Sequence, residues 1–565
     1  MPLLPRSRPA LRRWLPFLAW PRLTRGLLAV ELTAGITVGL MLVPQGLAYA
    51  QLAGMPAVTG IYACLAPALV AVLWSSSHRL GVGPTALTSL LVGASLAELA
   101  QPGSPQWIAL AVWLALMSGA VQLLLGAVRF GWLLNIITAP VLAGFTQAAS
   151  ILIFVSQLPP LVGLRGEFDT LLAHPDFHLP DTAFGLGGLA ALILLRRWRP
   201  RFPAAMAAVA VAAVVSWALD YAQGGGAVVG TVPAGLPAPS LPPALPRHLL
   251  GALVMPALAI ALVSFLETAS SAKVDTRLAG RQWDENQDLI GQGLSKLAAA
   301  FSGSFPTSAS FSRSALNLHA GARSGWATLF AVALVLAVLL VATPALYYVP
   351  QPVLAALVVA AVTNLFNPSE VLRLARISRV EAATWAVTFA LTLVTSPQLY
   401  WGVLAGILMS LSHFLYLRLH PRIIEVGLHP DGSLRDRHLW QLPPLAGRLY
   451  ALRMDAELDF ASAAALERNV AAHIDAHPRT AHVCLFAQPI NRIDATGVEA
   501  FARIRTLLHE RGIALHVSGL KLPVDTVLRG AGELPDGPLL HLYRTDIEAL
   551  GALARLDAMK EGGAT

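Results

Sequence analysis

An arginine stands among hydroxyl residues between two of the most apolar parts of the chain. The stretch reads GSFPTSASFSRSALNLHAGARSG at 303–325 and contains Pro306 and Arg313. An arginine at membrane depth costs about 2.5–3.5 kcal/mol on insertion scales, so we expect something to offset its charge. A bound anion would do so, and a helix that begins here would add roughly half a positive charge at its N-terminus. The pattern therefore predicts an anion site.

A matching pattern occurs in the first half of the chain. Gly81, Gly83 and Pro84 precede an apolar segment in HRLGVGPTALTSLLVG at 78–93. Short segments interrupted by Gly or Pro at corresponding places of two halves indicate the midplane site of a transporter. Proline is tolerated in the first turn of a helix, where its missing N–H group costs nothing. We therefore expect two half-helices whose N-termini face a small anion.

A second ionisable residue, Glu267, lies in the apolar segment ALVSFLETASSAK. It could form a permanent ion pair with Arg313 and have no part in transport. Its protonation could instead accompany the anion, or the ionised carboxylate could bind Na⁺ together with Ser271 or nearby carbonyl groups. The serines, for their part, could serve only close helix packing. The residues by themselves leave these alternatives open.

The composition indicates that lipid surrounds these segments. Of the 565 residues, 55% are hydrophobic and 13% are charged, which is too apolar for an ordinary soluble protein. Taking about 20 apolar residues for a span, and fewer where Gly or Pro interrupts, we predict fourteen spans. They lie at 27–50, 58–75, 84–100, 107–127, 132–156, 182–195, 203–219, 248–271, 290–302, 307–319, 325–346, 351–365, 381–396 and 400–417.

Basic residues orient these spans. Successive spans cross the membrane in opposite directions, starting from a basic N-terminal arm at residues 1–25. This places the run RRWRPR at 196–201 and the segment 273–281 on the same side as the arm. The connections 157–181 and 220–247, on the opposite side, hold few basic residues. By the positive-inside rule we expect cytoplasmic N- and C-termini and a multi-pass protein of the plasma membrane, the inner membrane if the cell is bacterial.

The composition changes beyond residue 420. Short β-type runs at 447–453, 482–487 and 513–520 alternate with helical patterns at 461–475, 495–511, 523–530 and 545–558. This order favours an α/β domain with a sheet covered by helices. We therefore predict a membrane domain at 26–419, a linker at 420–440 and a cytoplasmic domain at 441–565.

Several classes of function are disfavoured. Cys64 and Cys484 are too few and too separated for a disulfide framework, and no metal or other cofactor is indicated. The sequence contains no GxxxxGK[ST] phosphate loop, so ATP-driven pumping is unsupported. The histidines lack paired ligand spacing, which argues against an intramembrane enzyme. The arginines cluster beside apolar spans, so the net charge of +8 does not indicate nucleic acid.

Several motifs in order resemble the SulP family of anion transporters, whose relatives include prestin. They are VPQGLAYAQLAGMPAVTGIYACLAP (43–67), GPTALTSLLVG (83–93), ETASSAK (267–273), DENQDLIGQGLSK (284–296) and SFPTSASFSRSALNLHAGARS (304–324). The C-terminal part resembles a STAS domain, the fold of anti-sigma-factor antagonists. The resemblance implies two inverted repeats of seven spans, a core domain moving against a gate domain, and a homodimer.

The resemblance also implies a set of site residues. Carried onto this sequence, the anion site comprises Gln45, Tyr49, Thr85, Ala86, Phe311, Ser312 and Arg313. Tyr49 and Phe311 would wall the site against water, while Gln45 and the N–H groups of Ala86 and Ser312 would donate to the anion. Glu267 and Ser271 would hold the coupling ion, a proton or Na⁺.

Sulfate or a related oxyanion moved by proton symport is the function that this resemblance favours. The alternatives are a sodium-coupled bicarbonate symporter, a dicarboxylate or chloride transporter, a channel-like anion pathway and a sensor that does not transport. In the STAS part, DATG at 494–497 contains one hydroxyl, Thr496, where many relatives have two. Thr496 could be a phosphorylated switch, or it and Asp494 could only cap the following helix.

Overall fold

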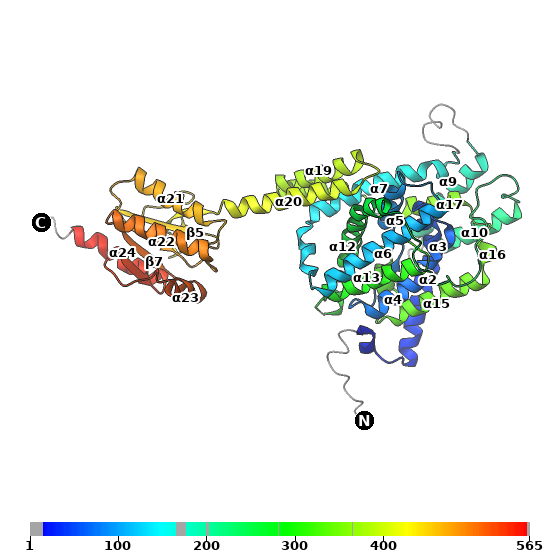
Figure 1. The fold of residues 1–565 in the computed structure, drawn as a ribbon, viewed down its shortest axis with the longest axis horizontal. Coiled ribbons are helices and arrows are strands. Elements are labelled where there is room, and N and C mark those ends of the chain that lie inside the picture. The colour runs from blue at the N-terminus through cyan, green and yellow to red at the C-terminus, as the bar shows by residue number, and fades with distance from the viewer. Residues whose placement is uncertain (1–14, 165–176, 199–202, 281, 364, 562–565) are drawn as a thin grey trace, which may run out of the picture. The chain divides into compact units, whose positions relative to one another are not determined.

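The computed structural model describes residues 15–164, 177–198, 203–280, 282–363 and 365–561 (Figure 1). The chain divides into two compact units after residue 410, a boundary that lies within the helix Tyr400–Leu419. Parts of the predicted basic segments lie outside the described residues, namely 1–14, 199–201 and Arg281.

Helices make up nearly all of the first unit, because its long apolar runs satisfy their backbone groups internally. Polar residues begin several of them, as Ser104 and Asp284 do by accepting hydrogen bonds from N–H groups of the first turn. The elements are η1 (Pro16–Ala19), α2 (Arg25–Leu52), α3 (Ala57–Tyr62), α4 (Ala66–Trp74), β1 (Val82–Gly83), α5 (Ala86–Leu96), α6 (Pro105–Ala127), η2 (Gly131–Ile136), α7 (Ala139–Leu161), α9 (Leu179–Trp198), α10 (Ala204–Ala218), α11 (Arg247–Ala252), α12 (Val254–Ala279), α13 (Glu285–Phe301), β2 (Ser308–Ala309), α14 (Phe311–His319), α15 (Trp326–Val341), α16 (Thr343–Leu346), α17 (Gln351–Val362), α18 (Pro368–Ile377), α19 (Arg379–Val394) and α20 (Tyr400–Leu419).

Each interval predicted as a span overlaps a helix of the described chain. Seven helices there are long and apolar enough to cross a membrane, counting 57–74 and 247–279 as single helices, and four shorter ones are apolar. Many large apolar side chains are exposed along them, for example Leu194, Val214 and Leu408. Such faces are expected where lipid is the solvent. The count of fourteen spans stays a prediction.

Two half-helices meet inside this unit. Two residues separate the short strand β1 from α5, and one residue separates β2 from α14. The strands pair antiparallel, with Val82 opposite Ala309 and Gly83 opposite Ser308. This pairing brings the N-termini of α5 and α14 together, as the Gly/Pro pattern predicts.

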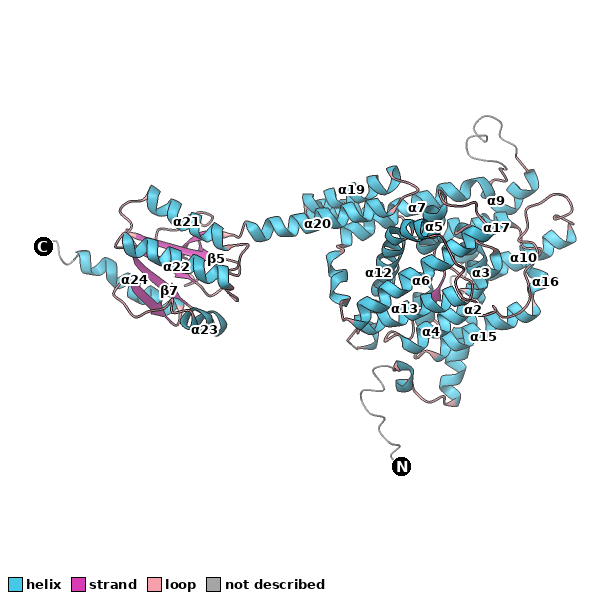
Figure 2. Ribbon diagram, in the orientation of Figure 1, coloured by secondary structure: helices cyan, strands magenta, loops and turns pink. Residues whose placement is uncertain are grey.

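The second unit is a sheet with helices on both faces (Figure 2). Its strand order is β4-β3-β5-β6-β7-β8, in which β5 to β8 are parallel and β3 is antiparallel to both neighbours. Helices α21, α22 and α23 share one apolar core with the sheet, and α24 packs in a second core around Cys484 and Phe486. The bounds are β3 (Ile423–Leu428), β4 (Leu434–Asp436), β5 (Leu449–Met454), α21 (Ala463–Ala476), β6 (His482–Phe486), α22 (Ala495–Glu510), β7 (Ala514–Ser518), α23 (Leu522–Gly530), β8 (Leu540–Tyr543) and α24 (Asp546–Glu561).

The segment expected as a linker, 420–440, is part of this sheet. Ile424 pairs with Arg453 of β5, and Val426 pairs with Asp436 of β4. Charged residues between the apolar positions gave these strands a loop-like composition, although Ile424 and Val426 are buried. Strands β3 and β4 extend the sheet with antiparallel pairing beyond β5. Strand β8 is also not among the β-type runs predicted from the sequence.

Two glycines allow α2 and α3 to touch. A Cβ atom added to Gly60 would overlap the carbonyl oxygen of Gly46, and one added to Gly46 would lie 2.8 Å from the Gly60 oxygen. Gly46 directly follows Gln45, and Tyr49 lies one turn further along α2. Close packing at this point therefore fixes the depth of both side chains in the unit.

We predict that Gly60→Ala forces α2 and α3 apart and lowers the melting temperature. The expected cost is that of an overpacked core, about 1–3 kcal/mol. Thermal unfolding of the purified protein in detergent measures it. Gly26→Ala is the control, since nothing lies within 4 Å of a Cβ atom added there. Equal melting temperatures for Gly60→Ala and the unchanged protein would contradict the prediction.

Candidate anion site

Arg313 is fully buried at the start of α14, and its exposed fraction is 0%. Its Nη1 atom donates to the carbonyl oxygen of Pro84 at 2.8 Å and to Oε1 of Gln45 at 3.1 Å. Its Nε and Nη2 atoms have no hydrogen-bond partner among the described residues. Both acceptors are neutral, so the positive charge and two donor atoms remain available to an anion.

The N-termini of α5 and α14 add partial positive charge near the guanidinium. Thr85 caps α5 by accepting from the N–H group of Thr88 at 3.3 Å, and Ser310 caps α14 in the same way. The N–H groups of Ala86 and Ser312 belong to these first turns, where no preceding turn supplies acceptors. Two helix dipoles therefore end close to Arg313.

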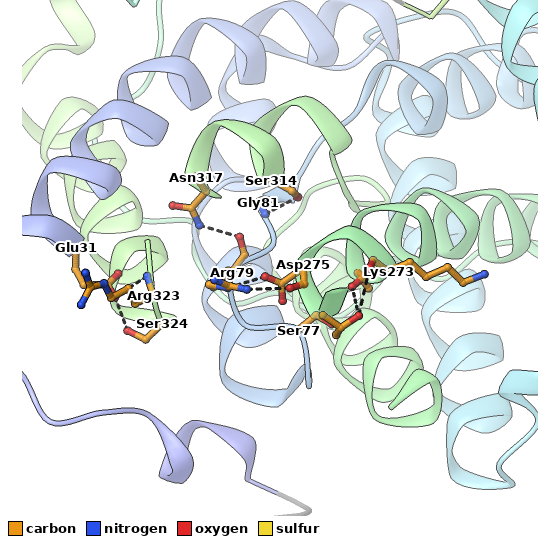
Figure 3. Close-up of polar contacts among 12 residues, drawn as sticks. Glu31, Ser77, Arg79, Gly81, Lys273, Asp275, Ser314, Asn317, Arg323 and Ser324 are labelled. Atoms are coloured by element: carbon orange, nitrogen blue, oxygen red, sulfur yellow. Dashed lines mark hydrogen bonds and ion pairs between the residues drawn. The ribbon is translucent and has the colours of Figure 1, made fainter. Parts of the chain in front are cut away.

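Direct contacts hold α14 against the segment before β1 (Figure 3). Ser314 Oγ accepts from the Gly81 N–H group at 3.1 Å, and Asn317 Nδ2 donates to the Arg79 carbonyl oxygen at 2.8 Å. A Cβ atom added to Gly81 would lie 2.7 Å from Cβ of Arg313. Glycine is thus required here so that the two chain segments can approach.

Glu267 contacts the capping residue of α5 rather than Arg313. Thr85 Oγ1 donates to Oε2 of Glu267 at 3.0 Å. Among the described residues, no ion pair within 4 Å joins Glu267 to Arg313, so the alternative of a permanent ion pair finds no support in the geometry. The Ser271 hydroxyl donates to the backbone oxygen of Glu267 at 3.1 Å and not to its carboxylate.

The residues carried over from the family fall into two groups. Gln45, Tyr49, Thr85 and Ala86 are buried, as is Arg313. In contrast, Phe311 is 57% exposed, Ser312 is also exposed, and the Ser312 hydroxyl lies 3.2 Å from that of Ser310. The wall against water therefore stays a prediction, with Tyr49 buried and the Phe311 side chain largely exposed.

The sequence analysis does not predict a role for Lys296, which is a buried lysine. Lys296 of α13 has an exposed fraction of 0%, and its Nζ atom donates to Oε1 of Gln122 at 2.9 Å. It lies within the predicted span 290–302, and an ionisable residue inside a span was the signal that would have marked it.

In the second unit, Asp494 acts as the cap of α22. Its Oδ1 atom accepts from the Gly497 N–H group at 2.8 Å, and its Oδ2 atom accepts from that of Phe460 at 3.0 Å. Thr496 is exposed in the first turn of α22. The capping role therefore belongs to Asp494, and the Thr496 hydroxyl is accessible at a helix N-terminus.

Two family models match the chain. The model of the sulfate permease family matches residues 28–388, and that of the STAS domain matches residues 444–545. A probable sulfate transporter of Mycobacterium tuberculosis is 32% identical over 535 residues, which cover 93% of this chain and 95% of the relative. A sodium-independent sulfate anion transporter of Bos taurus is 30% identical, with 93% and 89% covered.

Solved structures share the fold. Murine solute carrier 26 family member A9, an anion transporter in the inward-facing state, has a TM-score of 0.88 at 21% identity, covering 98% of this chain and 96% of that one. The transmembrane domain of a cyanobacterial bicarbonate transporter has a TM-score of 0.59 at 18% identity, covering 68% and 98%.

We predict that Arg313→Gln weakens sulfate binding by at least about tenfold, which corresponds to roughly 1.4 kcal/mol. The reason is the loss of the charge and of two unpartnered donors. The measurement is the rise in melting temperature with sulfate concentration. Arg323→Gln is the matched control, because its exposed side chain lies just after α14. Identical sulfate dependence for the two variants would remove Arg313 from the anion site.

Proposed function

Because the chain belongs to the sulfate permease family, whose members are anion transporters and not enzymes, we propose that it moves sulfate or a related oxyanion by proton symport. The observation that carries the proposal is the buried guanidinium of Arg313, with two unpartnered donors beside two helix N-termini. An oxyanion offers several acceptor oxygens and a negative charge, which match these groups. Alternating access then requires the α5 and α14 N-termini to face each side of the membrane in turn.

The proton site is Glu267. Its carboxyl group shares the Thr85 hydroxyl with the N-terminus of α5, so the proton and the anion act on neighbouring groups. An ionised carboxylate beside the site repels an anion, and this repulsion is strong where water is excluded. Protonation removes the repulsion, which links anion binding to proton uptake.

A sodium-coupled bicarbonate symporter is the second candidate. The favouring observation is the fold similarity to a bicarbonate transporter. The Ser271 hydroxyl donates to the backbone oxygen of Glu267 at 3.1 Å, which leaves its oxygen lone pairs for a sodium ion. A dicarboxylate or chloride transporter, or a channel-like pathway, would use the same anion site, and accumulation against a gradient separates a transporter from a channel.

We assign the remaining properties on the same basis. The membrane domain at 26–419, the homodimer and the placement in a plasma membrane with cytoplasmic termini are supported by the charge distribution and the family likeness. The C-terminal domain includes β3 and β4 and therefore begins before residue 441. Thr496 is a regulatory phosphorylation site in this proposal, since a phosphate at the N-terminus of α22 is favoured by the helix dipole.

We predict that proteoliposomes with an acidic exterior and no sodium accumulate radiolabelled sulfate. Inward proton movement supplies the free energy. Adding a protonophore abolishes the gradient and should release the accumulated sulfate. Absence of uptake here, together with bicarbonate uptake when sodium is added, would favour the second candidate.

Glu267→Gln is expected to abolish uptake driven by the proton gradient while leaving sulfate binding in place. The amide keeps the size of the side chain and its contact with Thr85 but cannot exchange a proton. Sulfate accumulation and sulfate-dependent melting report the two functions. Glu98→Gln, an exposed position, is the control. A Glu267→Gln protein that still accumulates sulfate along a proton gradient would refute the coupling role.

A further inference from the structure

Lys296 is a buried cation to which the proposed function assigns no role. We propose that Lys296 supplies the second positive charge of the transport site, so that one proton on Glu267 and one divalent oxyanion form a charge-balanced load. The inference rests on the proposed function and adds to it the charge of the substrate and the number of protons.

Tight packing explains why Lys296 cannot turn towards water. Helix α13 lies against α6 (Figure 1), and a Cβ atom added to Gly119 would lie 2.8 Å from Cβ of Lys296. A Cβ atom added to Gly293 would lie 2.8 Å from the Gly119 carbonyl oxygen. The close approach of the two helices leaves the lysine side chain inside the unit, where an ammonium group is costly without compensation.

Neutral groups connect Lys296 to the helix that carries Glu267. Gln122 accepts from Lys296 and donates from Nε2 to Oγ of Ser264 at 3.0 Å and to the Ala261 carbonyl oxygen at 2.6 Å. Ser308, in β2, donates to the backbone oxygen of Ser264 at 2.8 Å. A single polar network thus joins Lys296, α12 and the strand that precedes α14.

Other charged groups near this network already have their own partners. On α12, Asp275 forms an ion pair with Arg79 at 2.6 Å. On α13, Asp288 accepts from the Ser77 N–H group at 3.0 Å and from Trp283 Nε1 at 2.7 Å. Helix α6 contains no Asp, Glu, Lys or Arg. Glu267 lies one turn after Ser264 on α12, so it is the carboxylate next to the point where the network from Lys296 reaches this helix.

The formal charges then specify which combination of protons and anion neutralises the site. With Arg313 and Lys296 positive and Glu267 negative, the empty site carries one net positive charge. Protonation of Glu267 raises this to two, which a divalent oxyanion neutralises. Without Lys296, the protonated site would carry one positive charge and match a monovalent anion. A net charge is expensive in a water-excluded interior, so the balanced combination is the one favoured to move.

The test compares divalent and monovalent anions in proteoliposomes that contain the full-length chain. Lys296→Gln is expected to lower the ratio of sulfate uptake to nitrate uptake by about tenfold or more, since each 1.4 kcal/mol of lost binding is a factor of ten. Lys273→Gln is the matched control, because this exposed lysine follows Glu267 on α12. An unchanged ratio in Lys296→Gln would overturn the inference.

Two further measurements, on Lys296→Arg and on the unchanged protein, test the role of Lys296 if Lys296→Gln loses uptake of both anions. Lys296→Arg, which keeps the charge, is then expected to retain the sulfate preference. In the unchanged protein, one net negative charge should enter with each sulfate, as measured by current and isotope flux together. Two charges per sulfate, or none, would overturn the inference. Failure of the unchanged protein to accumulate sulfate would instead reject the proposed function.

Discussion

The first unit, which we call the membrane unit, depends on the burial of one guanidinium group among neutral acceptors. Among the residues that the structure describes, no carboxylate contacts Arg313, and its two hydrogen-bond partners are an amide oxygen and a carbonyl oxygen. Such a charge is stable inside a protein only if helix dipoles, a polar network or a bound ion offset it. The surrounding elements provide the first two, and they leave two donor atoms for the third.

The geometry around Arg313 follows from places where the backbone must come close. Glycine at 81 lets the segment before β1 touch α14, and the glycines at 46 and 60 let α2 carry Gln45 to the guanidinium. The pairing of β1 with β2 aligns the N-termini of α5 and α14. The small residues thus set the distances between the backbone segments that carry the site.

Coupling between proton and anion has a short physical route in this arrangement. Glu267, Thr85 and the N-terminus of α5 are consecutive hydrogen-bonded groups, and Ser264, one turn before Glu267, leads through Gln122 to Lys296. A change in charge at any of these groups alters the electrostatic potential at the others, because charges are screened less in the interior of a protein than at its surface. Charge balance within the membrane unit is therefore a property of the whole network.

The sequence by itself determined the membrane class, the paired half-helices, Arg313 as a buried cation and the α/β character of the C-terminal unit, because hydropathy and Gly/Pro patterns are local signals. Only the tertiary structure decided which groups meet. Arg313 bonds to Gln45, 268 residues away, and not to Glu267; Lys296 joins the network through Gln122; and β3 and β4 enter the sheet from the expected linker. These contacts depend on how distant segments pack, which no local pattern encodes.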